Sequence, residues 1–487
     1  MKWLNARVVC ALLAWVLVVP AAEAATRQQE LDRLVTKYHQ LRQFNGAVLV
    51  ADEKGVILKK GYGFANFEWQ APNTSDTKFR LGSVTKPFTA TVVMQLVAEG
   101  KLGLDDKLTK HLPDYRKDTG DRITLAHLLN HTSGLPNYTS PEFFQRESRN
   151  PFPVADFVKR FASGDLEFEP GTKWAYSNSG YHVLGAILEK VTGKPYAQVV
   201  RERIFDPLGM KSSGYDVAST VLPKRAGAYE FRPNGYVNAP YIDMSIPYAA
   251  GSLYSTVEDL YLFDRALYFD KLLPAAQKQQ MFTPKLGGYG FGWTVKPRQL
   301  HDGKTEVATL SHDGGVNGFA TLLVRVPDRK ELVVLLDNTS RGDKLDELAA
   351  GVLSILHGVK PRLPRAEIGE VVMATIEKSS VAEGIARYKA LKATKASEYD
   401  LSEGQLNNVG YMLLGSGRVA DAIEIFKLNV EMFPKQGNVY DSLGEAYLAS
   451  GNKELALVNY RKALELSPDN ANAAAMIKRL EKPTGGR

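Results

Sequence analysis

Two residues in the first quarter of the chain have the types and spacing for nucleophilic chemistry. Ser83 is followed three residues later by Lys86, directly ahead of an apolar, helix-like run over 88–98. On a helix this spacing places both side chains on one face. A serine needs a base before it can attack a carbonyl carbon, and a lysine whose pKa is lowered by burial can provide one. The pair indicates acyl transfer, although an isolated match is more often a helix-capping serine beside a solvated lysine.

Two later segments supply residues that suit the same chemistry. Tyr176 and Asn178 stand two positions apart, just before a helical pattern that begins at 182. His312 and Gly314 have the same spacing on a β-like segment that leads into the apolar run 320–326. In this order, Ser-x-x-Lys, Tyr-x-Asn and His-x-Gly resemble the motif set of penicillin-binding proteins and serine β-lactamases.

The resemblance extends over about residues 30–355. The chain is similar to the group that contains class C β-lactamases, D-alanyl-D-alanine peptidases and family VIII esterases, and the segments 128–136, 174–181 and 250–255 support this. The resemblance implies a serine hydrolase that needs no cofactor and acts on a small ester, amide or peptide. It also implies an α+β fold of the β-lactamase/transpeptidase type.

The resemblance assigns catalytic roles to matching positions. Ser83 would form an acyl-enzyme, while Lys86 and Tyr176 would share proton transfer with the nucleophile and the leaving group. Asn178 would donate to or accept from Lys86 or a substrate amide. The main-chain N–H groups of Ser83 and Gly315 would form an oxyanion hole, where each donor is commonly worth about 3 kcal/mol.

The third motif departs from the family pattern. His312 and Gly314 would contact substrate, but the family usually has Lys-Thr-Gly or Lys-Ser-Gly where this chain has His312-Asp313-Gly314. An unperturbed histidine is mostly neutral at pH 7, and Asp313 adds a carboxylate where the family has a hydroxyl. Both changes weaken recognition of a substrate carboxylate and shift the base role towards Lys86. We therefore expect neutral or cationic esters and amides to be preferred over β-lactams.

The elements that must position these residues alternate between strand-like and helix-like patterns. Strand pairs are expected at 47–51 with 56–59 and at 320–326 with 332–337. Helices are expected at 89–100, at 182–191 and after a capping box that begins at Ser255. The order predicts an antiparallel sheet built from both ends of residues 25–358 and flanked by helices, with a helical insertion.

Beyond a short basic, proline-containing stretch at 358–364 the pattern is helical and repetitive. Four residues recur after 34 positions, which is the period of tetratricopeptide repeats: Gly410, Ala422, Phe426 and Pro434 return as Gly444, Ala456, Tyr460 and Pro468. We expect an all-α repeat domain at 401–487, with a linker and flanking helix over 359–400. The repeats could bind a peptide or protein partner, pack on the hydrolase domain or drive dimerisation, and their sequence does not choose among these. Because two repeats are marginally stable, helices at about 378–393 and 471–482 should cover their ends.

The N-terminus has the pattern of a secretory signal. Lys2 and Arg7 precede an apolar run over 8–19, and Ala22-Glu23-Ala24 offers a cleavage site. Cleavage of 1–24 would remove the single cysteine, Cys10, and would leave a periplasmic or secreted protein without a stable membrane span. The net charge of +7 is spread along the chain without a basic run, which argues against nucleic acid as a partner.

Two other readings of the sequence remain. His127 and His131 have a spacing that can chelate a metal, but neither H-E-x-x-H nor a third ligand accompanies them, so no metal site is predicted. The second alternative is a non-hydrolytic protein that binds penicillin or cell-wall fragments and signals through the repeats. The complete set of Ser83, Lys86 and Tyr176 favours the enzyme.

Overall fold

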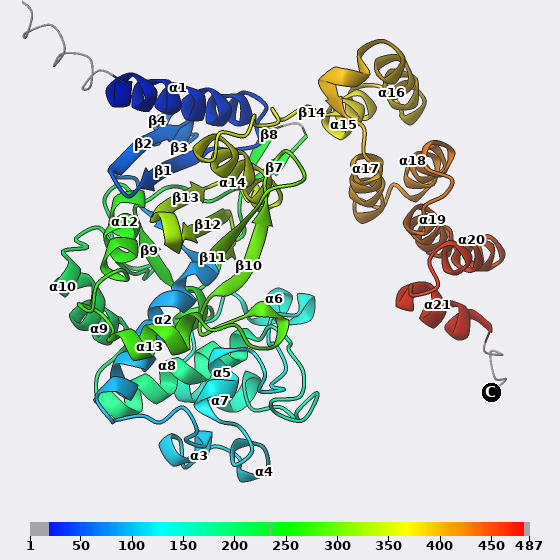
Figure 1. Ribbon diagram of the computed structural model, residues 1–487. Helices are drawn as coiled ribbons and strands as arrows, with labels where there is room; N and C mark the ends of the chain where they lie inside the picture. The colour runs from blue at the N-terminus through cyan, green and yellow to red at the C-terminus, as the bar shows by residue number, and fades with distance from the viewer. Residues whose placement is uncertain (1–18, 234, 482–487) are drawn as a thin grey trace, which may run out of the picture. The chain divides into compact units, whose positions relative to one another are not determined.

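The structure is a computed structural model that describes residues 19–233 and 235–481 (Figure 1). The chain divides into two compact units, of which the first consists of residues up to 231 and 236–363, and the second contains the chain from Pro364 onward. Residues 1–18, which hold most of the expected signal sequence, lie outside the described residues.

The first unit is built on a six-stranded antiparallel sheet in the order β10-β11-β12-β13-β1-β2. Its strands are β1 (Gly46–Asp52), β2 (Gly55–Tyr62), β10 (Thr294–Gln299), β11 (Glu306–Val316), β12 (Phe319–Val326) and β13 (Glu331–Asp337). β1 pairs with β13, and next to this pairing the Asn45 N–H donates to the Asp337 carboxylate at 2.8 Å. The prediction that both ends of the unit join one sheet is confirmed.

Alternate residues of the central strands enter two different cores. Val48 and Val50 of β1 pack in a cluster with α1 (Val19–Gln40) and α14 (Gly342–Leu356), which cover one face of the sheet. Leu49 and its neighbours on the opposite face enter a larger core. This period of two, with both faces buried, gives three layers of helix, sheet and helix.

The insertion between β2 and β10 is mainly helical and forms the far side of the larger core. Its longer helices are α2 (Thr85–Ala98), α8 (Asn178–Thr192) and α12 (Val257–Ala266). Shorter ones are α3 (Leu108–His111), α4 (Lys117–Gly120), α5 (Leu125–Leu129), α6 (Pro141–Glu147), α7 (Val154–Phe161), α9 (Tyr196–Val200), α10 (Asp206–Leu208), α11 (Tyr248–Gly251) and α13 (Ala275–Phe282). The cap of α12 is Thr256, whose hydroxyl accepts from the Asp259 N–H, so the expected cap at Ser255 is wrong by one residue.

The second unit consists of paired helices. They are α15 (Ile368–Lys378), α16 (Val381–Lys395), α17 (Glu403–Gly415), α18 (Val419–Met432), α19 (Gly437–Ala449), α20 (Lys453–Leu466) and α21 (Ala471–Glu481). Glycines allow the close approach within pairs: a Cβ on Gly410 would lie 2.4 Å from the ring of Phe426, and one on Gly444 would lie 3.1 Å from Tyr460. Among the described helices of both units, none is long and apolar enough to cross a bilayer.

Candidate active site

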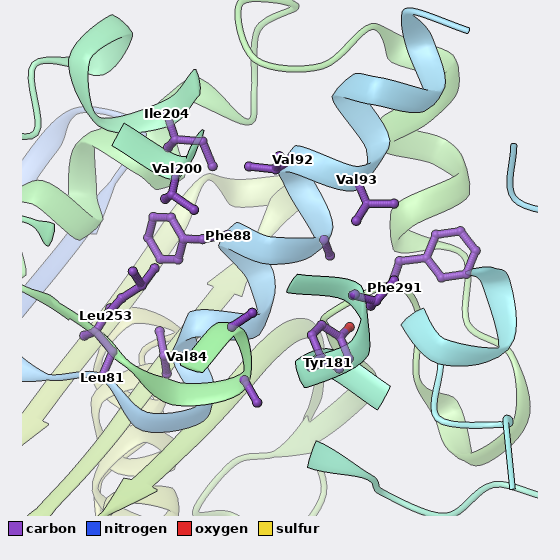
Figure 2. Packing of buried hydrophobic residues seen from close by; sticks show 14 of the residues in the cluster. Leu81, Val84, Phe88, Val92, Val93, Tyr181, Val200, Ile204, Leu253 and Phe291 are labelled. Atoms are coloured by element: carbon purple, nitrogen blue, oxygen red, sulfur yellow. The ribbon is translucent and has the colours of Figure 1, made fainter. Parts of the chain in front are cut away.

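Ser83 and Lys86 lie where a short 3₁₀ turn, Gly82–Val84, passes into α2. Ser83 is therefore in the first turn, whose N–H groups have no partner within the helix. The start of α2 is fixed by packing, since Val84 and Phe88 are fully buried in the larger core (Figure 2). This packing fixes the position of the turn that carries Ser83, the candidate nucleophile.

The side chain of Lys86 is fully buried and makes three polar contacts. Its Nζ lies 2.9 Å from Ser83 Oγ, 2.8 Å from Asn178 Oδ1 and 3.0 Å from the carbonyl oxygen of Ala250. Two of these oxygens only accept hydrogen bonds, so a neutral amine satisfies both with its N–H groups and keeps its lone pair for the Ser83 hydroxyl. Burial lowers the pKa of Lys86 well below its ordinary value, and the Asp313 carboxylate partly opposes this shift.

The amide of Asn178 is oriented by its surroundings at the start of α8. Ser177 caps this helix by accepting from the Gly180 N–H. Asn137 Oδ1 accepts from both the main-chain N–H and the side-chain NH₂ of Asn178, at 3.1 and 3.3 Å. The amide oxygen therefore faces Lys86, which is one of the two contacts expected from the sequence.

Tyr176 approaches Ser83 from the segment just before α8. The Ser83 side chain is close enough to lower the pKa of the Tyr176 hydroxyl, and Lys86 Nζ lies 4.8 Å from the centre of the tyrosine ring. Burial, and to a smaller extent Asp313, raise the pKa of Tyr176 above its ordinary value, although the contact with Ser83 opposes them. The hydroxyl thus stays protonated near neutral pH and can relay a proton, while Lys86 is the stronger candidate for the base.

The glycines of strand β11 lie close to the main chain on either side of Ser83. A Cβ on Gly314 would lie 2.1 Å from the carbonyl oxygen of Leu81 and 3.0 Å from the main-chain nitrogen of Ser83. Gly82 has a positive φ of 53°, and a Cβ there would lie 2.7 Å from the nitrogen of Gly315. The main chain at 82–83 therefore lies directly against the main chain at 314–315, and an oxyanion hole formed by the Ser83 and Gly315 N–H groups would need this closeness.

His312 faces into the protein. Its Nε2 lies 2.7 Å from the Tyr289 hydroxyl and its Nδ1 lies 2.6 Å from the main-chain oxygen of Asp313. Because that oxygen only accepts, Nδ1 carries the proton and Nε2 accepts from the tyrosine, which describes a neutral ring. Burial is the main cause that lowers the pKa of His312 to about 4. Both nitrogens are occupied, so in this structure His312 does not present a donor to substrate.

A cavity of about 530 Å³ opens beside Ser83. Its lining includes the aromatic and aliphatic side chains of Tyr138, Phe144, Ile242, Ile246 and Val316. The described residues that line it include three carboxylates, Glu230, Asp313 and Asp346, but neither lysine nor arginine. Asp346 is paired with Arg298 at 2.9 Å, whereas Asp313 is exposed and has no ion pair among the described residues. Asp313 is thus a carboxylate of this lining that is available to a ligand.

Three residues that contact the site were not predicted from the sequence. The Ala250 carbonyl, the Asn137 amide and the Tyr289 hydroxyl each contact a predicted site residue, but they lie far from it in the chain. Ala250 and Asn137 lie within or next to segments that support the family resemblance. Their position in or beside these segments could have marked Ala250 and Asn137 as candidates, but it does not show which of their atoms faces the site.

His127 and His131 do not form a metal pair. His127 Nδ1 accepts from the Thr124 N–H as part of a capping box at the start of α5, and His131 Nδ1 accepts from the Ser177 N–H. Across the described part of the chain no three His, Cys, Asp or Glu side chains gather as metal ligands. Each histidine therefore uses its Nδ1 to accept a hydrogen bond from a main-chain N–H.

Comparisons with known proteins agree with this fold. A β-lactamase family model matches residues 31–356, and a tetratricopeptide repeat model matches residues 437–470. A penicillin-binding protein of Bacillus subtilis is 31% identical over 350 residues, which cover 66% of this chain and 74% of the relative. The teichoic acid D-alanine hydrolase of Staphylococcus aureus is 28% identical over 314 residues, which cover 63% of this chain and 74% of the relative.

A solved structure gives the same result. The D-stereospecific amidohydrolase from a Streptomyces species superposes with a TM-score of 0.54 and 28% identity, covering 68% of this chain and 97% of that protein. The family model alone matches more than half of the chain, and it includes the residues of all three motifs. The chain therefore belongs to the β-lactamase family, to which it adds a C-terminal unit with a tetratricopeptide repeat.

Proposed function

We propose that the protein is a serine hydrolase that cleaves a small ester or amide through an acyl-enzyme on Ser83. The observation that carries this proposal is the 2.9 Å contact between Ser83 Oγ and the Nζ of a fully buried Lys86. A solvated lysine beside a capping serine, the simpler explanation of the motif, would be exposed and would make no such contact.

The geometry supports a two-step reaction. Lys86 takes the proton of Ser83 as Oγ bonds to the carbonyl carbon, and the N–H groups of Ser83 and Gly315 stabilise the developing oxyanion. Lys86 then returns the proton, by way of the Tyr176 hydroxyl, to the leaving oxygen or nitrogen as its bond to carbon breaks. In the second step a water molecule gives a proton to Lys86 as its oxygen bonds to the acyl carbon. The bond from that carbon to Ser83 Oγ then breaks and Lys86 returns the proton to Oγ, which releases the acid and restores the Ser83 hydroxyl.

The cavity supports a preference for substrates that carry no carboxylate. Asp313 faces the cavity, and His312 is neutral and occupied on both nitrogens. A substrate carboxylate would meet like charge, whereas an ammonium group would meet an unpaired carboxylate. The names of two relatives, a teichoic acid D-alanine hydrolase and a D-stereospecific amidohydrolase, suggest D-amino-acid esters and amides as the first compounds to test.

The remaining parts of the proposal concern location and partners. The N-terminal pattern of 1–24 supports export to the periplasm or beyond. The repeat at 437–470 supports contact with a protein, since such helical pairs present an extended surface. A fusion of residues 1–30 to a reporter that is active only outside the cytoplasm would test export, and an inactive fusion would contradict it.

The test is a substrate panel on the full chain and on Ser83→Ala. It should contain p-nitrophenyl acetate, D-alanine p-nitroanilide, a D-Ala-D-Ala peptide and nitrocefin. We expect Ser83-dependent turnover of the first two compounds and slower turnover of the last two. A nitrocefin rate that equals the ester rate would contradict the preference, and equal rates for wild type and Ser83→Ala would contradict the mechanism.

A fluorophosphonate probe separates the hydrolase from a non-hydrolytic binding protein. The hydrolase should be labelled at Ser83 and should also turn over an ester. A penicillin adduct at Ser83 that persists, with no turnover of any compound in the panel, would favour the binding protein instead.

A further inference from the structure

His131 has a backbone conformation that side chains rarely adopt. Helix α5 ends at Leu129, and His131 follows its C-cap, Asn130, with a φ of +61°. The Thr132 N–H donates to the His127 carbonyl at 2.9 Å, a bond that is typical of a helix end closed by a left-handed residue. Glycine usually occupies this position because it has no Cβ to strain a positive φ. The backbone conformation alone therefore does not explain why a histidine is found here.

The side chain and main chain of His131 hold both sides of Tyr176. The His131 carbonyl accepts from the Ala175 N–H at 3.0 Å, and its Nδ1 accepts from the Ser177 N–H at 3.2 Å. The imidazole lies against the Tyr176 ring, with 4.3 Å between the ring centres. One residue thus fixes the peptide groups next to Tyr176 and supports its ring.

The hydrogen bond from Ser177 sets the protonation of His131. A nitrogen that accepts from a main-chain N–H cannot carry a proton, so the ring is neutral with its hydrogen on Nε2. Burial and the nearby Lys86 and His312 keep its pKa well below the ordinary value. The tyrosines whose rings pack on it, Tyr176, Tyr181 and Tyr289, all have raised pKa values and are neutral as well. The contact with Ser177 therefore persists across the pH range in which the enzyme would work.

We propose that His131 is a positioning residue that sets the Tyr176 hydroxyl against Ser83. The inference rests on the proposed function, because it assigns His131 to the proton relay of that reaction. His131 touches neither substrate nor the reacting atoms; it acts through the segment 175–177. Displacing a catalytic group by about 1 Å can cost on the order of 100-fold in rate, so the loss of this support should be measurable.

The test uses two substitutions of similar size. His131→Asn places an oxygen at the same number of bonds from Cα as Nδ1, and asparagine tolerates positive φ. His131→Leu has the shape of asparagine but no acceptor. With p-nitrophenyl acetate and the full chain, we expect His131→Leu to lower kcat by about 30-fold or more and to leave KM within about 3-fold. His131→Asn should recover most of the lost kcat.

A double-mutant cycle distinguishes positioning from a general structural role. If His131 acts through the Tyr176 hydroxyl, adding His131→Leu to Tyr176→Phe should lower kcat by less than about 3-fold, because the hydroxyl is already absent. Equal fold losses in both backgrounds would overturn the inference. Equal kcat for His131→Leu and wild type would overturn it too.

Thermal unfolding of each variant controls for folding. If His131→Leu fails to fold, the double-mutant cycle is measured with His131→Asn instead. This variant keeps an acceptor but lacks the imidazole ring that packs on Tyr176. It should then lower kcat by about 5-fold in the wild-type background and leave it unchanged beside Tyr176→Phe; a loss in both backgrounds would overturn the inference. Retained activity in Ser83→Ala would contradict the proposed function itself. If Ser83→Ala is inactive but the His131 substitution causes equal fold losses in both backgrounds, only the proposed role of His131 is contradicted.

Discussion

The Asp313 carboxylate favours the charged form of Lys86, which lies on a different element of the fold. Burial lowers the pKa of this lysine, and Asp313, on β11, opposes the shift through space. The motif residue that departs from the usual family pattern thus acts on Lys86, the proposed base. Under the proposed function, Asp313 would couple substrate preference to the pH dependence of the reaction.

Replacing Asp313 should therefore move the pH profile. Asp313→Asn removes a negative charge that stabilises the Lys86 ammonium, so the pKa of Lys86 should fall further and activity should persist to lower pH. The acid limb of kcat/KM for the uncharged p-nitrophenyl acetate measures this shift. Asp346→Asn is the matched control, because Asp346 also lines the cavity but is paired with Arg298. An acid limb that moves to higher pH in Asp313→Asn would contradict the coupling.

Substitution of Lys86 should abolish turnover even where the positive charge is kept. Arginine cannot lose its proton in a protein, so Lys86→Arg lacks a base just as Lys86→Met does. Both variants should lose about 1,000-fold in kcat, within the range for removal of a general base. Steady-state kinetics with p-nitrophenyl acetate measures the loss. An arginine variant with a tenth of the wild-type rate would exclude Lys86 as the base.

The neutral state of His312 should make the fold sensitive to acid. Its pKa is about 4 in the folded protein and about 6.5 in an unfolded chain, so the unfolded state binds more protons between these values. The free energy of unfolding should fall as the pH drops from 6.5 to 4, by about 3 kcal/mol from this residue. Urea unfolding at pH 7 and pH 4.5 measures the difference, which should be smaller in His312→Gln. An equal pH dependence in the two proteins would contradict the assignment.

The repeat unit should be sensitive at Gly410. An added Cβ would lie 2.4 Å from the ring of Phe426, so Gly410→Ala should destabilise this unit by about 1–3 kcal/mol. Gly404 lies on the same helix with nothing within 4 Å of a Cβ, and Gly404→Ala should be neutral or slightly stabilising. Thermal unfolding of the full chain, followed by circular dichroism, compares the two. If the two substitutions destabilised equally, the glycine would not be needed for helix approach.

Sequence patterns predicted the parts of this fold that depend on local periodicity. The apolar runs at 47–51 and 332–337 correspond to β1 and β13, and their pairing follows from the need to bury both faces of the sheet. The 34-residue period predicted tetratricopeptide-type helices, and a repeat model matches residues 437–470. These features are encoded in spacing and in residue size, which a single sequence shows.

The contacts that orient the site are not encoded in spacing. Asn137 reaches Asn178 across 41 positions, and the Ala250 carbonyl reaches Lys86 across 164. Every residue has a main-chain oxygen, so the residue type at 250 does not indicate a contact with Lys86. The residue type at 137 likewise does not indicate which partner its amide binds. His312 has the position that the motif predicts, yet its Nε2 accepts a hydrogen bond from the Tyr289 hydroxyl. This contact could not be predicted from the motif.

The pairing of β1 with β13 also constrains the order of events during synthesis. The Asn45 N–H donates to the Asp337 carboxylate 292 positions later, so one edge of β1 stays without its neighbour until almost the whole first unit has been made. Contacts of such long range slow folding, and an open strand edge invites pairing with other chains in the meantime. The helical pairs of the repeat unit close over short distances along the chain and should form much faster. The first unit is thus the part of the chain that most needs protection from aggregation while it folds.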